Sequence, residues 1–297
     1  MADEQPGSIA VWVLAARPKT LWAAMAPVFM GTAMAAVDGT FQLWAALAAL
    51  AGAMLIQIGT NYANDYYDYT KGADEGERLG PLRVTQAGLV SPSAMRTATA
   101  IVFGAAFVIG IYLVVRGGWP IVVIGLLSIL FGILYTAGPY PLGYNGLGEI
   151  FVLVFFGPVA VGGTYYVQAL TIDATVLIAG LSPGLFSVAI LAVNNLRDID
   201  SDRRANKRTL AARFGRTFGR MEYVLAVVIG SLIPTALCIA HKASIWVLLT
   251  LVVPLIAIPT FRTVCATVDG PRLNNVLATT GKLLLLFAVL FSVGWMI

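Results

Sequence analysis

The chain has 297 residues, of which 59% are apolar and only 11% are charged, and its mean hydropathy is +0.84. Soluble domains usually carry about 25% charged residues, so these values exclude a soluble enzyme and predict an all-α integral membrane protein. The formal net charge of +4 calls for no nucleic acid partner, because an excess of basic residues on the cytoplasmic side is normal for proteins embedded in a lipid bilayer.

Nine apolar runs are long enough to cross a bilayer as helices, which takes about 17 to 25 residues each. These predicted spans are Thr20–Val37, Gln42–Thr60, Ala94–Val115, Trp119–Ala137, Leu147–Ala169, Ala174–Asn195, Arg220–Ala240, Ser244–Phe261 and Gly281–Ile297. We expect the nine transmembrane helices to surround a central cavity that is open to the cytoplasmic side. Residues 1–297 are predicted to form a single transmembrane domain.

The distribution of Lys and Arg predicts how the chain is oriented, because cytoplasmic loops carry the excess of these residues. If the N-terminus is cytoplasmic, all of the 19 basic residues except Arg116 and Lys242 lie on the cytoplasmic side. We therefore expect a multi-pass protein whose N-terminus faces the cytoplasm.

The second predicted span runs directly into a polar stretch, Asn61–Arg83. Four of its side chains recur at i, i+3, i+4 and i+7, which places them on one face of a helix; they are Asn61, Asn64, Asp65 and Asp68. Glycines then predict a loop, which contains Asp74. The basic residues that follow the acidic face are Lys71, Arg78 and Arg83.

The sixth predicted span runs into a second polar stretch, Asn194–Arg208. Its amide and two of its carboxylates recur at i, i+4 and i+8, so they stack along one helical face; these residues are Asn194, Asp198 and Asp202. Asp200 points elsewhere. The basic residues at the end of this stretch are Lys207 and Arg208.

The two acidic faces together predict a magnesium site. Carboxylates held close together repel one another unless a cation lies between them. Four spans separate Asp68 from Asp198, so both faces return to the same side of the membrane, and the recurrence hints at a duplicated four-helix unit at about residues 16–145 and 146–265. Mg²⁺ prefers carboxylate oxygens and leaves positions for phosphate oxygens. The nearby basic residues then suit a diphosphate, and the apolar interior suits a lipid tail.

Three further side chains have two interpretations each. Arg17 lies at the cytoplasmic mouth of the first span, as an interfacial anchor or a substrate contact. Tyr135 begins a Pro- and Gly-rich connection that we expect to turn near the cavity, and its ring either stabilises a cation or anchors the interface. Glu149 ends that connection, either at the membrane interface or in the site.

The two motifs, Asn64-Asp65-x-x-Asp68 and Asn194-x-x-x-Asp198-x-x-x-Asp202, resemble those of the UbiA superfamily of intramembrane aromatic prenyltransferases. The resemblance is nearest to the branch that acts on 1,4-dihydroxy-2-naphthoate in menaquinone synthesis. Further stretches that resemble this branch are 16–20 (ARPKT), 64–74 (NDYYDYTKGAD), 78–83 (RLGPLR), 138–142 (GPYPL) and 146–149 (GLGE). The first motif usually has another aspartate where this chain has Gly72, and here Asp74 follows instead.

This resemblance implies Mg²⁺-dependent transfer of a polyprenyl group from polyprenyl diphosphate to 1,4-dihydroxy-2-naphthoate, with loss of CO₂ and diphosphate, giving demethylmenaquinol. It implies a bacterial plasma membrane enzyme with a cytoplasmic active site. The implied metal ligands are Asn64, Asp65, Asp68, Asn194, Asp198 and Asp202, and the four aspartates are the implied catalytic residues. The substrate-binding candidates are Arg17, Lys71, Arg78, Arg83, Tyr135, Lys207 and Arg208.

Two alternatives stay open at the level of sequence. The first keeps the superfamily but changes the acceptor to 4-hydroxybenzoate, homogentisate, haem or chlorophyllide. The second is a cation- or proton-coupled secondary transporter, whose ionisable residues would be expected near the middle of the membrane. The acidic residues here follow the ends of spans and precede basic loops, which favours the prenyltransferase.

Overall fold

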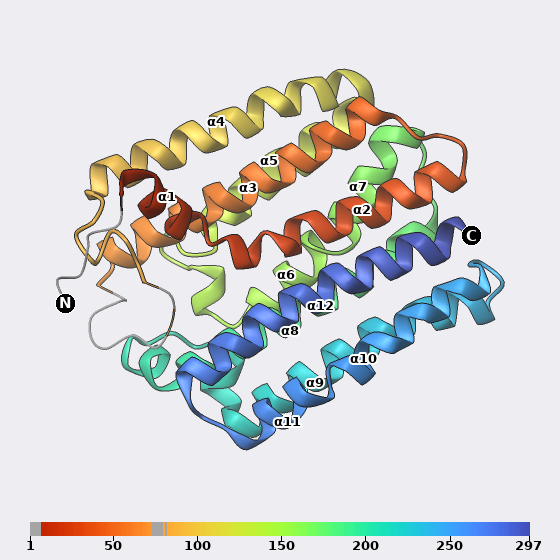
Figure 1. Cartoon of the computed structure of the whole chain (residues 1–297). Helices are drawn as coiled ribbons and strands as arrows, with labels where there is room; N and C mark the ends of the chain where they lie inside the picture. The colour runs from red at the N-terminus through yellow and green to blue at the C-terminus, as the bar shows by residue number, and fades with distance from the viewer. Residues whose placement is uncertain (1–6, 73–79, 81) are drawn as a thin grey trace.

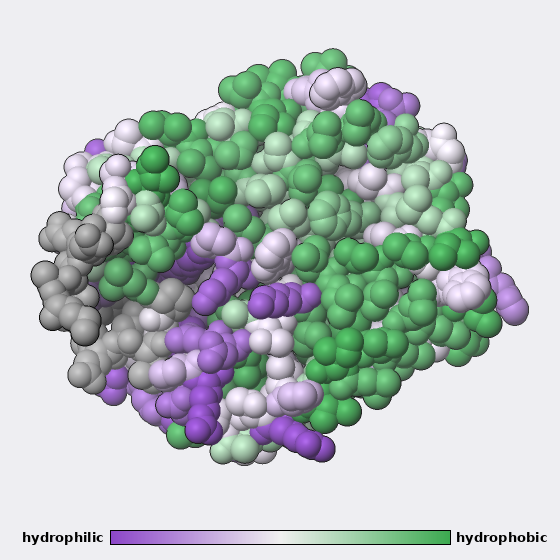
Figure 2. All heavy atoms as spheres, viewed as in Figure 1, coloured by the Kyte–Doolittle hydropathy of each residue, from purple (hydrophilic) through white to green (hydrophobic). Residues whose placement is uncertain are grey.

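The computed structural model describes residues 7–72, 80 and 82–297, and within these residues every regular element is a helix. The helices run back and forth between two ends of an elongated bundle (Figure 1). The two helices that carry the polar stretches, α3 (Leu43–Thr70) and α8 (Ala174–Arg204), finish at the same end. We call this the polar end, because hydrophilic side chains gather there whereas hydrophobic ones cover most of the remaining face in Figure 2.

The helices are long enough for the integral membrane protein that the sequence predicts. Among the described residues, seven helical segments are long and apolar enough to cross a membrane, and the pair Ser8–Thr20 and Trp22–Val37, bent by 54°, makes an eighth if it is one span. Helix α5 (Trp119–Leu134) is apolar but shorter. Nine spans therefore remain a prediction.

The other helical elements complete the bundle. The first bent segment consists of α1 (Ser8–Ala16), η1 (Pro18–Thr20) and α2 (Trp22–Val37). The remaining elements are α4 (Pro92–Gly117), η2 (Leu142–Tyr144), α6 (Gly148–Phe155), α7 (Pro158–Ala169), α9 (Leu210–Ile239), η3 (Ile245–Leu251), α10 (Val252–Ile256), α11 (Ile258–Ala266) and α12 (Gly270–Met296).

The span expected at Leu147–Ala169 is broken into α6 and α7. Pro158 opens α7, where its missing N–H requires no helical partner. The preceding Gly157 packs against α8 so closely that an added Cβ would lie 2.7 Å from the carbonyl oxygen of Gly180. Glycine is thus required at this contact, although Gly148–Ala169 as a whole is still long and apolar enough to cross a membrane as one span.

Helix α8 lies at the centre of the packing, in contact with α7, α9 and α12. Its Phe186 is fully buried against Phe287 of α12, with the ring centroids 4.9 Å apart. Contacts of this kind fix α8 among its neighbours through van der Waals packing, which is what joins helices in a bilayer. The polar residues at the end of α8 are therefore held on a well-packed helix.

Both motif helices continue past the apolar spans that were predicted for them. α3 extends to Thr70 and α8 to Arg204, so the polar residues of each motif are carried on unbroken helix. The bent first segment is attached to α3 as well, because Asn61 donates hydrogen bonds to the carbonyl oxygen of Ala16 at 2.9 Å and to the hydroxyl of Thr20 at 3.2 Å. This attachment brings the α1–α2 bend to the polar end.

Candidate active site

Two adjoining chambers occupy the bundle. The first, the polar chamber, has a volume of about 420 Å³ at the polar end, and its polar lining includes Arg17, Asn64, Asp68, Arg83, Tyr144, Asn194, Asp198, Asp202 and Lys207. The second, the apolar chamber, has a volume of about 540 Å³ and lies between α3, α4, α5, α6 and α7. The residues that line both chambers are Gln57, Asn64, Tyr135, Val152 and Phe156.

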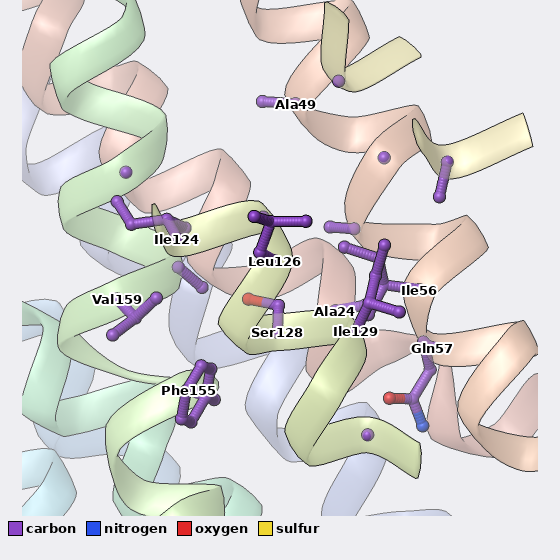
Figure 3. Close-up of a pocket in the computed structure, with 18 of the residues that line it drawn as sticks. Ala24, Ala49, Ile56, Gln57, Ile124, Leu126, Ser128, Ile129, Phe155 and Val159 are labelled. Atoms are coloured by element: carbon purple, nitrogen blue, oxygen red, sulfur yellow. The ribbon is translucent and has the colours of Figure 1, made fainter. Parts of the chain in front are cut away.

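The apolar chamber is lined almost entirely by hydrocarbon. Figure 3 shows Ile56 of α3, Ile129 of α5 and Phe155 of α6 among its lining, with the amide of Gln57 and the hydroxyl of Ser128 as the polar exceptions among the labelled side chains. Several apolar lining residues of α4 and α5 are exposed, among them Phe107, Val115 and Leu126.

The α3 side of the polar chamber is centred on Asp68, which is 1% exposed. Its carboxylate pairs with the guanidinium of Arg83 and accepts a hydrogen bond from the Tyr144 hydroxyl at 2.5 Å. The ammonium of Lys207 lies 3.5 Å away and 4.5 Å from the centroid of the Tyr144 ring, a cation–π arrangement. Three loops distant in sequence thus converge on one carboxylate.

The other polar residues of α3 divide between two directions. Asn64 faces the chamber, and its side-chain oxygen accepts a hydrogen bond from Thr136 at 2.9 Å. Asp65 is buried beside the chamber but is not part of its lining; it accepts a hydrogen bond from the backbone N–H of Thr85 at 3.1 Å. Here Asp65 fastens the segment that follows residue 82 to α3.

The α8 side of the polar chamber is formed by the stacked residues Asn194, Asp198 and Asp202. All three line the chamber, as their helical spacing requires. Asp200 points outward, with its side chain 64% exposed and its carboxylate 2.7 Å from Arg216. The helical register expected from the sequence therefore holds at this helix.

Arg197 is a residue of this site that sequence reasoning missed. Its guanidinium donates to both carboxylate oxygens of Asp198, at 2.7 and 2.5 Å, and to the side-chain oxygen of Asn194 at 2.8 Å. A fourth hydrogen bond, of 2.6 Å, reaches Asn274 of α12. The signal was present in the spacing, because Arg197 follows Asn194 by three positions and so lies beside it on the helix.

The predicted basic residues have different surroundings. Arg17, Arg83 and Lys207 line the polar chamber. The ammonium of Lys71 donates to the carbonyl oxygens of Thr136 and Gly138, at 2.6 and 3.0 Å, on the loop after α5. Burial lowers the pKa of Lys71, and the nearby Asp68 carboxylate opposes this shift.

Of the two other predicted basic residues, Arg208 is not part of the chamber lining. Arg208 has an exposed side chain, and its backbone N–H donates to the carbonyl oxygen of Tyr144 at 2.6 Å, which fixes the loop after α8 to η2. Arg78, like Asp74, lies outside the described residues.

Tyr135 stands where the two chambers meet. Glu149, at the start of α6, is buried and accepts a hydrogen bond of 2.9 Å from Asn195, a residue of the chamber lining. Glu149 thus holds a residue of the chamber lining in place without being part of that lining.

The donor set fits magnesium shared with a phosphate ligand. Among the described residues, no three His, Cys, Asp or Glu side chains gather closely enough to enclose an ion by themselves. Each side of the polar chamber instead offers an amide oxygen and one or two carboxylates. Mg²⁺ is commonly held by one or two carboxylates and completes its coordination with water and phosphate oxygens, so an open site of this kind suits it.

The chain matches the UbiA prenyltransferase family over residues 24–277. It belongs to this family. The resemblance inferred from the two motifs is thereby confirmed. The UbiA-family chain is 37% identical to the 1,4-dihydroxy-2-naphthoate octaprenyltransferase of Haemophilus influenzae, over 97% of this chain and 96% of that one. It is 39% identical to the enzyme of the same name from Mycobacterium tuberculosis, over 95% of each chain.

Solved structures of UbiA homologues share the fold. One, from Archaeoglobus fulgidus bound to GPP and Mg²⁺, aligns with a TM-score of 0.68 and 13% identity, over 96% of this chain and 99% of that one. Another, from Aeropyrum pernix, aligns with a TM-score of 0.67 and 14% identity, over 94% and 97% of the two chains. The all-α architecture is thus that of the UbiA family.

Proposed function

We propose that this protein transfers a polyprenyl group from polyprenyl diphosphate to 1,4-dihydroxy-2-naphthoate, with loss of diphosphate and CO₂, to give demethylmenaquinol. One observation carries the proposal: a chamber lined by charged side chains adjoins a chamber lined by hydrocarbon, and the two share five lining residues. A prenyl diphosphate has the same division between head and tail. The choice of acceptor is supported by the names of the bacterial relatives that match over nearly the whole chain.

The apolar chamber is the proposed place of the prenyl tail. A prenyl tail that enters from the lipid gains little from the hydrophobic effect, so its binding in the chamber depends on van der Waals packing against the lining side chains. Exposed apolar residues of the lining, such as Phe107, Val115 and Leu126, would let a long tail continue into the bilayer.

The polar chamber is the proposed place of the diphosphate. Mg²⁺ held by the two acidic faces would neutralise phosphate oxygens and make diphosphate a better leaving group. Its proposed protein ligands in the chamber lining are Asn64, Asp68, Asn194, Asp198 and Asp202; Asp65, which is buried beside the lining, is a sixth candidate. Arg83 and Lys207 add positive charge beside Asp68, where it stabilises the departing diphosphate.

The junction between the chambers is the proposed place of the C–O bond that joins the allylic carbon to the diphosphate and breaks in the reaction. Tyr135 lies there, and the face of its neutral ring stabilises positive charge on the allylic carbon. The acceptor attacks that carbon through the ring carbon that bears its carboxylate. When the bond to the carboxylate breaks, CO₂ leaves and its electron pair restores the aromatic ring.

We also propose that the polar end faces the cytoplasm of a bacterium and that the helices cross its plasma membrane. The basis is the position of the basic residues, which concentrate at this end while Arg116 and Lys242 lie toward the other. Both substrates' charged groups would then enter from the cytoplasm, and the tail from the lipid.

A product analysis tests the proposed function. Membranes containing the protein would be incubated with 1,4-dihydroxy-2-naphthoate, Mg²⁺ and prenyl diphosphates of increasing length, and the products identified by mass. We expect prenylated, decarboxylated naphthoquinols and no product after chelation of divalent metal. Preference for 4-hydroxybenzoate, homogentisate, haem or chlorophyllide would reject the acceptor. Cation uptake by proteoliposomes without a prenylated product would reject the reaction class.

Glycine variants test the place of the tail. Gly125 lines the apolar chamber, and a Cβ added to it meets no atom within 4 Å, so Gly125→Leu fills the chamber without a clash of its first atom. We expect about tenfold lower kcat/KM with a long prenyl diphosphate and a smaller loss with a five-carbon one. Gly104→Leu on α4 is the matched control, because Gly104 also has free space around its Cβ but lies outside the lining.

A further inference from the structure

The guanidinium of Arg197 is buried inside a membrane protein at the edge of the polar chamber, with only 3% of the residue exposed. Its four hydrogen bonds go to three side chains, namely Asp198, Asn194 and Asn274. Two of these, Asp198 and Asn194, line the chamber on the α8 side. Arg197 itself is not part of that lining, so it faces the site only through its neighbours.

These hydrogen bonds leave room for a metal on the same oxygens. A carboxylate has about four lone-pair positions and a side-chain carbonyl has two. Arg197 occupies one position on each oxygen of Asp198 and one on the oxygen of Asn194. Each oxygen therefore keeps the capacity to bind a cation while the guanidinium fixes its direction.

The link to Asn274 provides an anchor outside α8. Asn274 lies on α12, 77 positions away in sequence, and accepts from Nη1 at 2.6 Å. α12 packs along both α2 and α8. The planar fork of arginine can hold three partners in fixed directions, which the single ammonium of lysine cannot do.

We propose that Arg197 is a positioning residue: held by Asn274 of α12, it sets the side chains of Asn194 and Asp198 for metal binding without touching metal or substrate. This inference rests on the magnesium site of the proposed function. It assigns to α12, which carries no acidic motif, a part in the geometry of the active site.

A competing role makes the opposite prediction. If Arg197 acted only as a positive charge that competes with the metal for Asp198, its removal would tighten metal binding, because like charges repel. If it positions the ligands, its removal loosens metal binding although a repulsive charge is lost. Asn274→Ala separates the two roles further, since it breaks the anchor and leaves the charge of Arg197 in place.

Metal affinity can be measured without turnover. The full-length protein, purified in detergent, would be titrated with Mn²⁺ in the presence of a non-reacting thiodiphosphate analogue of farnesyl diphosphate, and free Mn²⁺ followed by electron paramagnetic resonance. The variants are Arg197→Lys, Arg197→Gln and Asn274→Ala. Arg216→Gln is the matched control, because Arg216 also pairs with an aspartate of α8 but at the exposed position Asp200. Circular dichroism and gel filtration identify variants that remain folded.

We expect 10- to 100-fold weaker Mn²⁺ binding in Arg197→Lys and Arg197→Gln, the range found when supporting residues of metal sites are replaced. Asn274→Ala should weaken binding by about three- to tenfold, and Arg216→Gln by less than twofold. Unchanged affinity in a folded Asn274→Ala together with either folded Arg197 variant, or tighter binding in Arg197→Gln, would overturn the inference. If the unaltered protein binds no Mn²⁺, the proposed metal site itself is wrong. If the unaltered protein binds Mn²⁺ and the variants bind it equally well, only the role of Arg197 is wrong.

Discussion

The two sides of the polar chamber hold their carboxylates by different means. On the α3 side, Asp68 is satisfied by groups from three loops, the most distant of which, Lys207, is 139 positions away. On the α8 side, Asp198 is satisfied by the adjacent Arg197. Asp68 is therefore fully paired only when the loops have assembled, whereas Asp198 is arranged by its own helix, with α12 as the neighbour; Asp202 on the same helix still depends on Thr209 from the segment after α8.

Loss of a carboxylate on either side should have the largest effect. We expect Asp68→Asn and Asp198→Asn each to lower kcat at least 100-fold, since both remove charge from the proposed metal site. The same holds for Asp65→Asn and Asp202→Asn. Steady-state kinetics on purified protein gives the values, with gel filtration as the folding check, and near-normal rates in any two of these variants would contradict the shared metal site.

Asp65 offers a sharper version of this test. Asparagine at this position keeps an oxygen that accepts the hydrogen bond from Thr85, so the attachment of the loop is preserved. A loss of 100-fold or more would therefore assign Asp65 to the metal. A loss below about threefold would assign it to the loop alone.

Arg83→Gln should have the next largest effect, because it removes the buried partner of Asp68. Breaking a buried pair leaves an uncompensated charge and destabilises by about 3–5 kcal/mol where no other partner remains; here Tyr144 and Lys207 remain. We expect about 10- to 100-fold lower kcat/KM for the prenyl diphosphate. If Arg83 serves only the fold, thermal stability falls while kcat/KM of the folded fraction is unchanged.

Tyr144→Phe is a milder change on the same side. It removes one hydrogen bond to Asp68 but keeps the ring beneath Lys207. A hydrogen bond to a charged group contributes about 1.5–3 kcal/mol, and because Arg83 and Lys207 still pair with Asp68, we expect the lower end of that range, a loss of about tenfold in kcat/KM. An equal loss in Tyr144→Leu would mean that the ring itself contributes nothing.

Asp200→Asn should have the smallest effect. Its ion pair with Arg216 is exposed, and such pairs contribute about 0–1 kcal/mol. We expect activity within about twofold of the unaltered protein, against the large loss in Asp198→Asn two positions earlier. Equal losses in the two variants would contradict the orientation of α8 in the chamber.

Helical periodicity predicted the features of the site that depend on one element. The separation of Asp200 from Asp198 and Asp202 follows from the 3.6-residue repeat and needs no knowledge of neighbouring helices. The Pro- and Gly-rich connection from Tyr135 to Glu149 was expected near the cavity from its turn residues, and it brings Tyr144 to Asp68.

Features that depend on contacts between elements were beyond the sequence. The direction of Asp65 is decided by Thr85, a loop residue with no periodic relation to α3. The break between α6 and α7 is marked locally by the pair Gly157-Pro158, but the close approach of Gly157 to Gly180 on α8 is a contact between elements that the sequence does not specify. Arg197 was overlooked because its importance comes from Asn274 on the last helix as much as from its own helix.

The shared lining of the two chambers has a consequence for how the products leave. In the proposed reaction, the C–O bond that breaks joins the water-soluble diphosphate to the lipid-soluble prenyl group. Tyr135 and Phe156 lie at the boundary between the polar and the apolar chamber. Each product is then already in the phase that dissolves it: diphosphate beside water and the prenylated quinol beside the hydrocarbon of the membrane. Release therefore requires neither product to cross a phase boundary, so transfer between phases adds no barrier to turnover.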